Sequence, residues 1–206
     1  MERTSISSLG PISQTLLINV CIRVLESRRP DPLLRDEQAI RIVDRLGLDP
    51  QAWVKTREPD LTFAVMRMVQ FDSQARSFLK SDPDGAVVDI GCGLDGRLER
   101  IDNGRVQWFG LDLPEVIAAR RELLPEAPRA CLIAGSSLDF GWMEALAAWR
   151  ERPVLFLAEG VLPYFTEGQV RSLVLALKDC FPGAELVFDT TSPFLIKLHN
   201  QNPDLK

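Results

Sequence analysis

Hydrophobic positions change their spacing near residue 82 of this 206-residue chain. Before it, apolar residues recur every three or four positions, which is the period of a helix that buries one face. After it, short and nearly continuous apolar runs alternate with helical stretches, as in a parallel sheet covered by helices on both faces. The sequence therefore predicts a helical N-terminal cap over residues 1–82 and an α/β core over residues 83–206.

Three helices are expected in the cap. The first spans Ile12–Arg29 and ends at Pro30, because proline cannot continue a helix. The second is short, carries apolar residues between Ala39 and Leu46 and stops at Gly47. The third runs from about Leu61 to Lys80. Its side chains expected to turn inward are Phe63, Met66, Phe71, Phe78 and Leu79.

Five strands and four helices are expected in the core, after a turn at residues 81–85. The strands are Ala86–Ile90, Val106–Leu111, Cys131–Ala134, Pro153–Ala158 and Glu185–Phe188. The helices are Leu94–Ile101, Pro114–Leu124, Gly141–Trp149 and Thr166–Phe181. This alternation predicts a doubly wound, mostly parallel sheet.

A glycine turn after the first strand is the most specific local pattern. It reads Asp89-Ile90-Gly91-Cys92-Gly93-Leu94-Asp95-Gly96, and its glycines let the backbone approach a ligand closely. The spacing of Gly91, Gly93 and Gly96 also fits a dinucleotide fingerprint, which leaves an NAD-dependent enzyme as a weakly supported alternative. The Asp89 carboxylate would repel a pyrophosphate and can hold an ammonium group, which favours S-adenosylmethionine. A helix cap is the alternative role for Asp89.

The ends of the next strands supply further candidate ligands, because ligands of open α/β sheets bind beyond the carboxyl ends of the strands. Asp112 follows the glycine turn by about 20 residues, where an acid accepts hydrogen bonds from ribose hydroxyls; it could also cap the helix that begins at Pro114. Ser137 and Leu138 follow the third strand and are placed to flank an adenine, one polar and one apolar. A loop with a helix cap is their alternative reading.

The fourth strand ends in a charged residue, a glycine and an aromatic cluster, which suggests the wall where cofactor meets substrate. Glu159 supplies the charge, and Tyr164 is the only tyrosine of the chain. Tyr164 is a weak catalytic candidate, with ordinary packing as the alternative.

Composition restricts the partners and the compartment. The formal net charge is −5 and the only small basic clusters are Arg28-Arg29 and Arg120-Arg121, so nucleic acid and anionic membranes are poor partners. No apolar run approaches the roughly 20 residues that span a bilayer, and the N-terminus lacks a signal-peptide pattern. Four scattered cysteines and a single histidine, His199, argue against a metal site and against a disulfide framework. We therefore expect no metal and a cytoplasmic location.

Taken together, these motifs resemble the leucine carboxyl methyltransferase family, and within it the bacterial O-methyltransferases of polyketide biosynthesis of the tetracenomycin-pathway type. The glycine turn through Arg97 looks like the family's own loop, and other matching segments follow in order through most of the chain. They are residues 13–15, 23–27, 36–39, 67–72, 108–114, 134–142, 159–164 and 181–186.

This resemblance implies a class I S-adenosylmethionine-dependent methyltransferase with a Rossmann-like fold. It implies methyl transfer to a carboxylate or hydroxyl oxygen of a small molecule, for example a polyketide-type metabolite. It places Arg67 on the cofactor's carboxylate, Asp112 on the ribose, Ser137 and Leu138 at the adenine and Glu159 beside the methionyl part. The N-terminal helices would form a lid over the substrate.

The chain also departs from the family pattern. Gly96 replaces a threonine, Val69 an arginine, and Ser137 an aspartate that many relatives carry. The family fold continues beyond the fifth strand with an antiparallel hairpin, which Asn200–Lys206 cannot supply. The fifth strand would then be an open edge where a second copy of the chain could pair. A catalytically impaired binding or scaffold protein is therefore the alternative function.

The scarcity of general bases bears on the acceptor. His199 is a weak candidate for a base because of its place near the chain end. A carboxylate acceptor needs no base, whereas a hydroxyl usually needs one. The sequence thus favours a carboxylate or an acidic hydroxyl.

Overall fold

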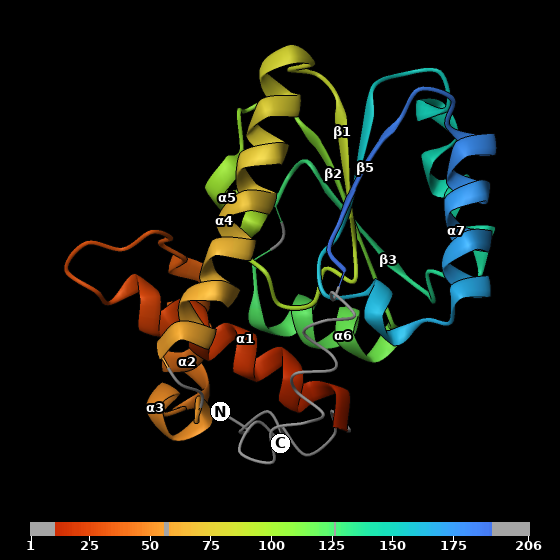
Figure 1. Ribbon diagram of the computed structural model, residues 1–206. Helices are drawn as coiled ribbons and strands as arrows, with labels where there is room; N and C mark the ends of the chain where they lie inside the picture. The colour runs from red at the N-terminus through yellow and green to blue at the C-terminus, as the bar shows by residue number, and fades with distance from the viewer. Residues whose placement is uncertain (1–10, 56–57, 126, 191–206) are drawn as a thin grey trace.

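A five-stranded parallel sheet forms the centre of the computed structural model (Figure 1), which describes residues 11–55, 58–125 and 127–190. The strand order is β3-β2-β1-β4-β5, and every neighbouring pair is parallel. The strands are β1 Ala86–Ile90, β2 Gln107–Asp112, β3 Ala130–Ala134, β4 Val154–Ala158 and β5 Glu185–Phe188. Each lies within one residue of its predicted bounds, so the doubly wound fold class is confirmed.

The strand order reverses between β1 and β4, which are hydrogen-bonded neighbours with Asp89 paired to Leu157. Crossovers from these strands leave on opposite faces, which opens a crevice at their carboxyl ends. The glycine turn follows β1, and Glu159 follows β4. The topology therefore brings these two sequence motifs together at one point.

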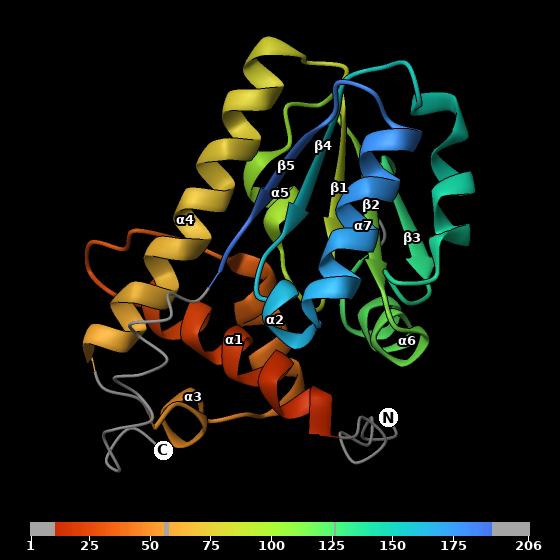
Figure 2. The same cartoon turned by 45° about the vertical axis from the view of Figure 1, so that its right-hand side comes forward.

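Helices cover both faces of the sheet (Figure 2). On one face, α4 (Glu58–Ser81) and α5 (Arg97–Ile101) pack on alternate strand residues such as Val87. On the other face, the 3₁₀ helix η2 (Phe140–Trp149) and α7 (Glu167–Cys180) pack on the intervening residues. The helix α6 (Pro114–Leu123) follows β2. These helices match the predicted positions, except that α5 begins at Arg97 instead of Leu94 and η2 winds as a 3₁₀ helix.

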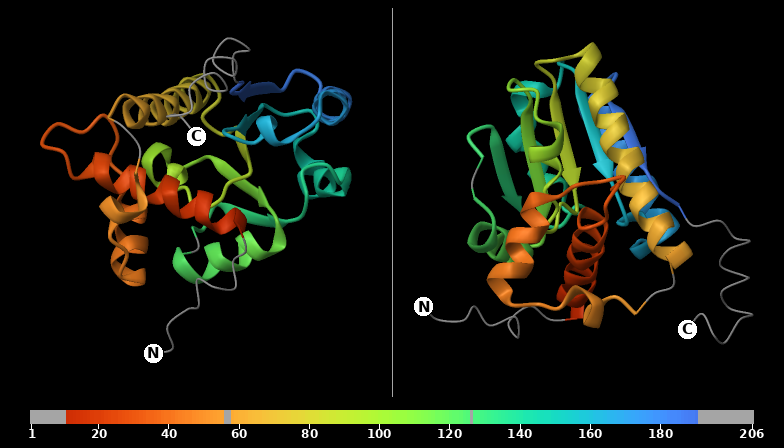
Figure 3. Two further views of the ribbon diagram at one scale, coloured as in Figure 1. Left: turned by 60° about the horizontal axis from the view of Figure 1, so that its bottom comes forward. Right: turned by 90° about the vertical axis from the view of Figure 1, so that its left-hand side faces the viewer.

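The N-terminal helices lie across the carboxyl edge of the sheet (Figure 3). They are α1 (Pro11–Ser27), α2 (Glu37–Leu46) and the single turn α3 (Pro50–Trp53), which the sequence pattern did not predict. Asp36 caps α2 by accepting a hydrogen bond from the Ala39 N–H, as expected for an N-cap aspartate. Because α1 spans the crevice, it can form a wall of any site there.

Two inward-facing residues of the third predicted helix were assigned wrongly. Phe63 is 66% exposed and Met66 is 53% exposed, whereas Val65 and Met68 are buried. The buried stripe of α4 continues from Met68 through Phe71 and the later predicted core positions, so Phe63 and Met66 fall on other sides of the helix. Because α4 contributes to both the N-terminal cluster and the sheet core, the boundary at residues 82–83 stays a prediction.

Candidate functional site

Two cavities lie at the crevice and share Gly91, Glu159 and Gly160 in their walls. The inner cavity has a volume of about 340 Å³ and includes Asp89 and Arg67 in its lining. The outer cavity has a volume of about 540 Å³ and extends past the ends of β2 and β3. Both are also lined by Thr15, Leu16 and Asn19 of α1 and by Tyr164. Apart from Leu138, the predicted cofactor-binding residues thus line these two adjoining cavities.

The glycine turn has a backbone that other residues cannot easily adopt. Gly91 has φ of +72° and Gly93 has φ of +46°. A Cβ at Gly91 would lie 2.4 Å from Val161 Cγ2, and one at Gly93 would lie 2.7 Å from Leu16 Cδ2. Glycine is therefore required both for the left-handed conformation and for the close approach of neighbouring walls.

Asp112 is held rigidly beside this turn. Its Oδ2 accepts a hydrogen bond from the Gly93 N–H at 2.8 Å, and its Oδ1 accepts one from the Leu113 N–H at 2.8 Å. Burial raises the pKa of Asp112, against the opposing effect of these two N–H groups. The N-cap of α6 is Leu113, so Asp112 binds the turn and lines the outer cavity instead of serving as the cap residue.

Asp89 is almost fully buried at the end of β1, and its Oδ1 lies 3.6 Å from Arg97 Nη1. Burial raises the pKa of Asp89 to about 7, and the Arg97 charge only partly opposes this. The N-cap of α5 is Gly96, with no side-chain cap bond, so Asp89 does not cap the helix. Asp89 is instead a wall residue of the inner cavity.

A pH dependence of stability follows from Asp89. Between about pH 4 and pH 7, the folded protein keeps a proton on Asp89 that the unfolded chain has lost. The free energy of unfolding should therefore fall across this window because of Asp89, and this contribution should be constant above it. In Asp89→Asn that contribution disappears. The difference in melting temperature, variant minus wild type, should therefore be several degrees larger at pH 8 than at pH 4.5, as measured by calorimetry.

Asp84→Asn provides the control for this measurement. Asp84 is exposed, and its hydrogen bond with Arg105 lowers its pKa, so its titration lies below the window. This variant should run parallel to wild type above pH 4.5. A pH profile of Asp89→Asn that is also parallel to wild type would show that Asp89 is ionised throughout.

Arg97 is the centre of a buried ion-pair network. Its side chain is 1% exposed and contacts Asp72 at 2.8 Å, Asp95 at 3.2 Å, Asp89 and Glu159. The surrounding carboxylates hold the pKa of Arg97 well above its usual range despite its burial. The network thus joins α4, the glycine turn and the end of β4 in one cluster.

Arg67 enters this network from α4. Its Nε donates to Glu159 Oε1 at 3.1 Å, and its Nη1 donates to Asp189 Oδ2 at 3.2 Å. Asp189 Oδ1 also accepts a hydrogen bond from the Gly160 N–H at 2.7 Å. The sequence reading missed Asp189. Its position directly after β5, at the same carboxyl edge as the other acids, was the signal that could have identified it.

The remaining predicted residues are only partly brought together. Ser137 lines the outer cavity, but Leu138 lines neither cavity. The Leu138 N–H donates to Ser136 Oγ at 3.2 Å, which turns the chain toward η2 directly after Ser137. Tyr164 is 75% exposed at the cavity rim. His199 and the predicted lack of a hairpin lie outside the residues that the structure describes.

Residues 17–178 match the leucine carboxyl methyltransferase family, which is most of the chain. The chain belongs to this family. It is 30% identical to the tetracenomycin polyketide synthesis O-methyltransferase TcmP of Streptomyces glaucescens, over 92% of this chain and 69% of that protein. It is 29% identical to the S-adenosyl-L-methionine-dependent methyltransferase dpfgK of Gibberella zeae, over 92% of this chain and 70% of that protein.

A solved structure is also similar to this family member. The glycopeptide N-methyltransferase MtfA complexed with S-adenosyl-L-methionine is 26% identical, covers 57% of this chain and 53% of its own, and superposes with a TM-score of 0.43. The present chain therefore spans about two thirds of the two sequence relatives and about half of this structural one.

S-adenosylmethionine is the cofactor of this family member, and the residues present fit it. The narrow glycine turn leaves backbone, without side chains, at the centre of the crevice. One end of the crevice offers Arg67 and several carboxylates, which suit an amino-acid group, and the other offers Asp112, which suits a ribose. Membership in the family thus favours S-adenosylmethionine over NAD as the cofactor to which the glycine spacing points. Within the described ranges, no helix is long and apolar enough to cross a membrane.

Proposed function

We propose that this protein is an O-methyltransferase that acts on a carboxylate or hydroxyl of a small molecule, for example a polyketide-type metabolite, in the cytoplasm. The outer cavity carries this proposal. Its volume is about 540 Å³, and apolar side chains of Leu111, Leu113, Val161 and Phe165 form much of its wall. Asp112 and Ser137 mark the part of this cavity that the cofactor would fill, so the part beside Val161, Tyr164 and Phe165 would receive an acceptor with an apolar or aromatic body. The O-methyltransferase name of the Streptomyces relative supports the same chemistry.

The proposed mechanism relies on positioning. S-adenosylmethionine would supply an electrophilic methyl group for transfer to the acceptor oxygen, so the protein's part is to hold the two reactants in line. Asp112 would fix the ribose end, while Arg67 and Asp89 would orient the amino-acid end. Leu16 of α1 lies over the glycine turn and helps to exclude water, which strengthens these electrostatic contacts.

The polar residues around the outer cavity support a carboxylate or acidic hydroxyl as acceptor. The chain has one histidine, His199, which lies outside the described residues. Beside Asp112 and Glu159, the polar side chains among the described residues of this cavity are the hydroxyls and the amide of Thr15, Asn19, Ser136, Ser137 and Tyr164. A carboxylate is already nucleophilic at neutral pH, so these hydrogen-bonding groups suffice to orient it.

The test is a turnover assay with methyl-labelled S-adenosylmethionine and paired aromatic acids and phenols of matched shape. We expect S-adenosylhomocysteine to form with at least one acid, and the labelled product to lose its methyl group in mild base, as an ester does. A base-stable ether as the only product would contradict the carboxylate assignment. Asp112→Asn provides the control for the site. Because this variant should bind the cofactor more weakly, it should form less product than wild type does.

One observation supports the scaffold alternative. Within the described residues, β5 is an edge strand of the sheet, Phe188 at its end is 47% exposed, and a groove of about 410 Å³ separates β5 from Phe71 of α4. An open edge of this kind can pair with a second copy of the chain. Cofactor binding without turnover across the whole acceptor panel, together with self-association, would favour this alternative over catalysis.

A further inference from the structure

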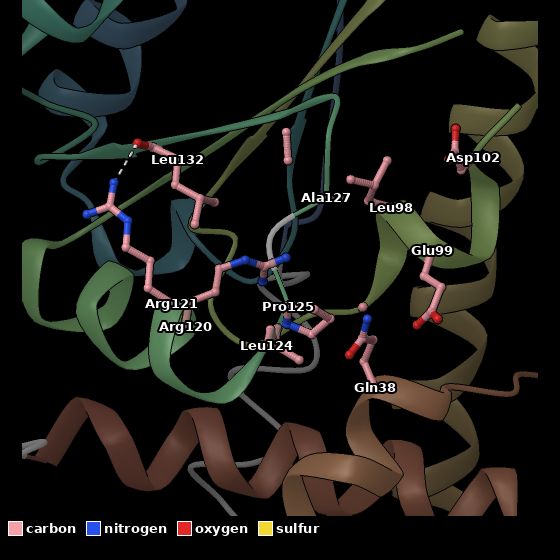
Figure 4. A pocket seen from close by; sticks show the side chains of 12 residues that line it. Gln38, Leu98, Glu99, Asp102, Arg120, Arg121, Leu124, Pro125, Ala127 and Leu132 are labelled. Carbon is pink, nitrogen blue, oxygen red and sulfur yellow. Dashed lines mark hydrogen bonds between the residues drawn. The ribbon is translucent and has the colours of Figure 1, made fainter. Parts of the chain in front are cut away.

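A third cavity, of about 280 Å³, lies behind the glycine turn between α5, α6 and β3 (Figure 4). It has no residue in common with the two cavities at the crevice. Leu98, Leu124 and Leu132 contribute apolar walls, and the adjacent arginines Arg120 and Arg121 contribute the positive charge. This is the basic pair noted in the sequence, and only Nη1 of Arg120 contacts the glycine turn of the cofactor site.

Arg120 is a buried cation with unused donors. It is 9% exposed, and Figure 4 shows its side chain extending from α6 into the cavity. Its Nη1 donates to Gly93 O at 2.9 Å and to Cys92 O at 3.4 Å. Among the described residues, its Nε and Nη2 donate to no acceptor, and no carboxylate lies within ion-pair distance. The guanidinium edge formed by these two nitrogens is therefore available to a ligand.

The acidic residues of the cavity do not neutralise this edge. Glu99 accepts two hydrogen bonds from Arg41, each at 2.9 Å, and Asp102 pairs with Arg129. Arg121 has no carboxylate partner within the described ranges; its Nη2 lies 3.4 Å from Leu132 O. Among the described residues, these two arginines thus form no direct ion pair, and the Arg120 charge acts only at longer range on Asp89 and Asp112.

We propose that this cavity binds a small carboxylate with a short apolar tail. The planar Nε–Nη2 edge of Arg120 matches the two oxygens of a carboxylate, and this bidentate pairing is stronger than a neutral hydrogen bond. Arg121 adds positive charge at the mouth, and the tail packs on Leu98 and Leu132. Binding through this edge leaves the hydrogen bond from Arg120 Nη1 to the Gly93 carbonyl oxygen intact. The site is separate from the proposed acceptor cavity and does not depend on the proposed function.

The location is tested by methyl NMR on the full chain with labelled leucines, titrated with hexanoate. We expect shifts for Leu98, Leu124 and Leu132 but not for Leu16 and Leu111, which line the outer cavity. Hexylammonium has the same tail with opposite charge and should leave all five unchanged. Shifts confined to Leu16 and Leu111, equal shifts with both probes, or none with millimolar hexanoate would each overturn the proposal.

The chemistry of recognition is tested with variants. Arg120→Lys keeps the charge but loses the planar fork, and should weaken hexanoate binding about tenfold. Arg121→Gln, at an exposed position, should weaken it about threefold, while Arg150→Gln at a distant exposed position should not change it. Inorganic phosphate supplies charge without a tail; binding as tight as that of hexanoate would contradict the role of the apolar walls. Unchanged binding in both cavity variants would overturn the assignment to the arginine pair.

Discussion

Arg97→Met is expected to lower the free energy of unfolding by about 3–5 kcal/mol, because it leaves buried carboxylates without their counter-ion. The Arg97 side chain is 1% exposed and faces Asp72, Asp95, Asp89 and Glu159. Methionine is unbranched and flexible enough to fill much of the space, so packing loss contributes less than the lost charge. The negative groups would then repel one another without a buried cation between them.

The measurement is urea unfolding at pH 7.5, followed by circular dichroism, with Arg105→Met as the matched control. Arg105 also pairs with an aspartate, Asp84, but both side chains are more than half exposed. Removing such an exposed pair should change the free energy of unfolding much less than the loss of Arg97 does. Equal losses in the two variants would show that the Arg97 network contributes no more than a surface ion pair.

The sheet could be predicted from the sequence because each strand is a short apolar run, bounded by turns and separated from the next by a helical stretch. This pattern fixes the order of elements and, with glycine after the first strand, the edge where ligands bind. It does not fix the rotation of a helix that contacts two separate cores. Phe63 and Met66 were misplaced for that reason, since α4 packs on the N-terminal helices at one end and on the sheet at the other.

The ion-pair network could not be predicted, because it depends on contacts between distant segments. Arg67 reaches Asp189 across 122 positions of sequence, and Arg97 reaches Glu159 across 62. Neither spacing leaves a local signal. The departure at Gly96 also has a tertiary cause: a Cβ there would lie 2.6 Å from Asp36 Oδ1, the cap of α2. Glycine at this position therefore allows α2 to pack against the start of α5.

Asp112→Asn is expected to weaken S-adenosylhomocysteine binding about 10- to 100-fold, measured by calorimetric titration. Both Asp112 oxygens already accept backbone N–H groups, from Gly93 and Leu113. An asparagine has only one carbonyl oxygen, so in either orientation its NH₂ group would face one of these N–H donors. The variant would thus distort the glycine turn and also lose a charged acceptor for the ribose, and a hydrogen bond to a charged group is worth about 1.5–3 kcal/mol.

Asp102→Asn is the matched control, because Asp102 lies at the end of α5, lines neither crevice cavity and pairs with an exposed arginine. It should bind S-adenosylhomocysteine as wild type does, and NAD should bind to none of the three proteins. Wild-type affinity in Asp112→Asn would mean that the ribose does not lie beside β2. Loss of affinity with an unchanged melting temperature would instead show that the substitution acts at the cofactor site. A general distortion of the fold would lower both the affinity and the melting temperature.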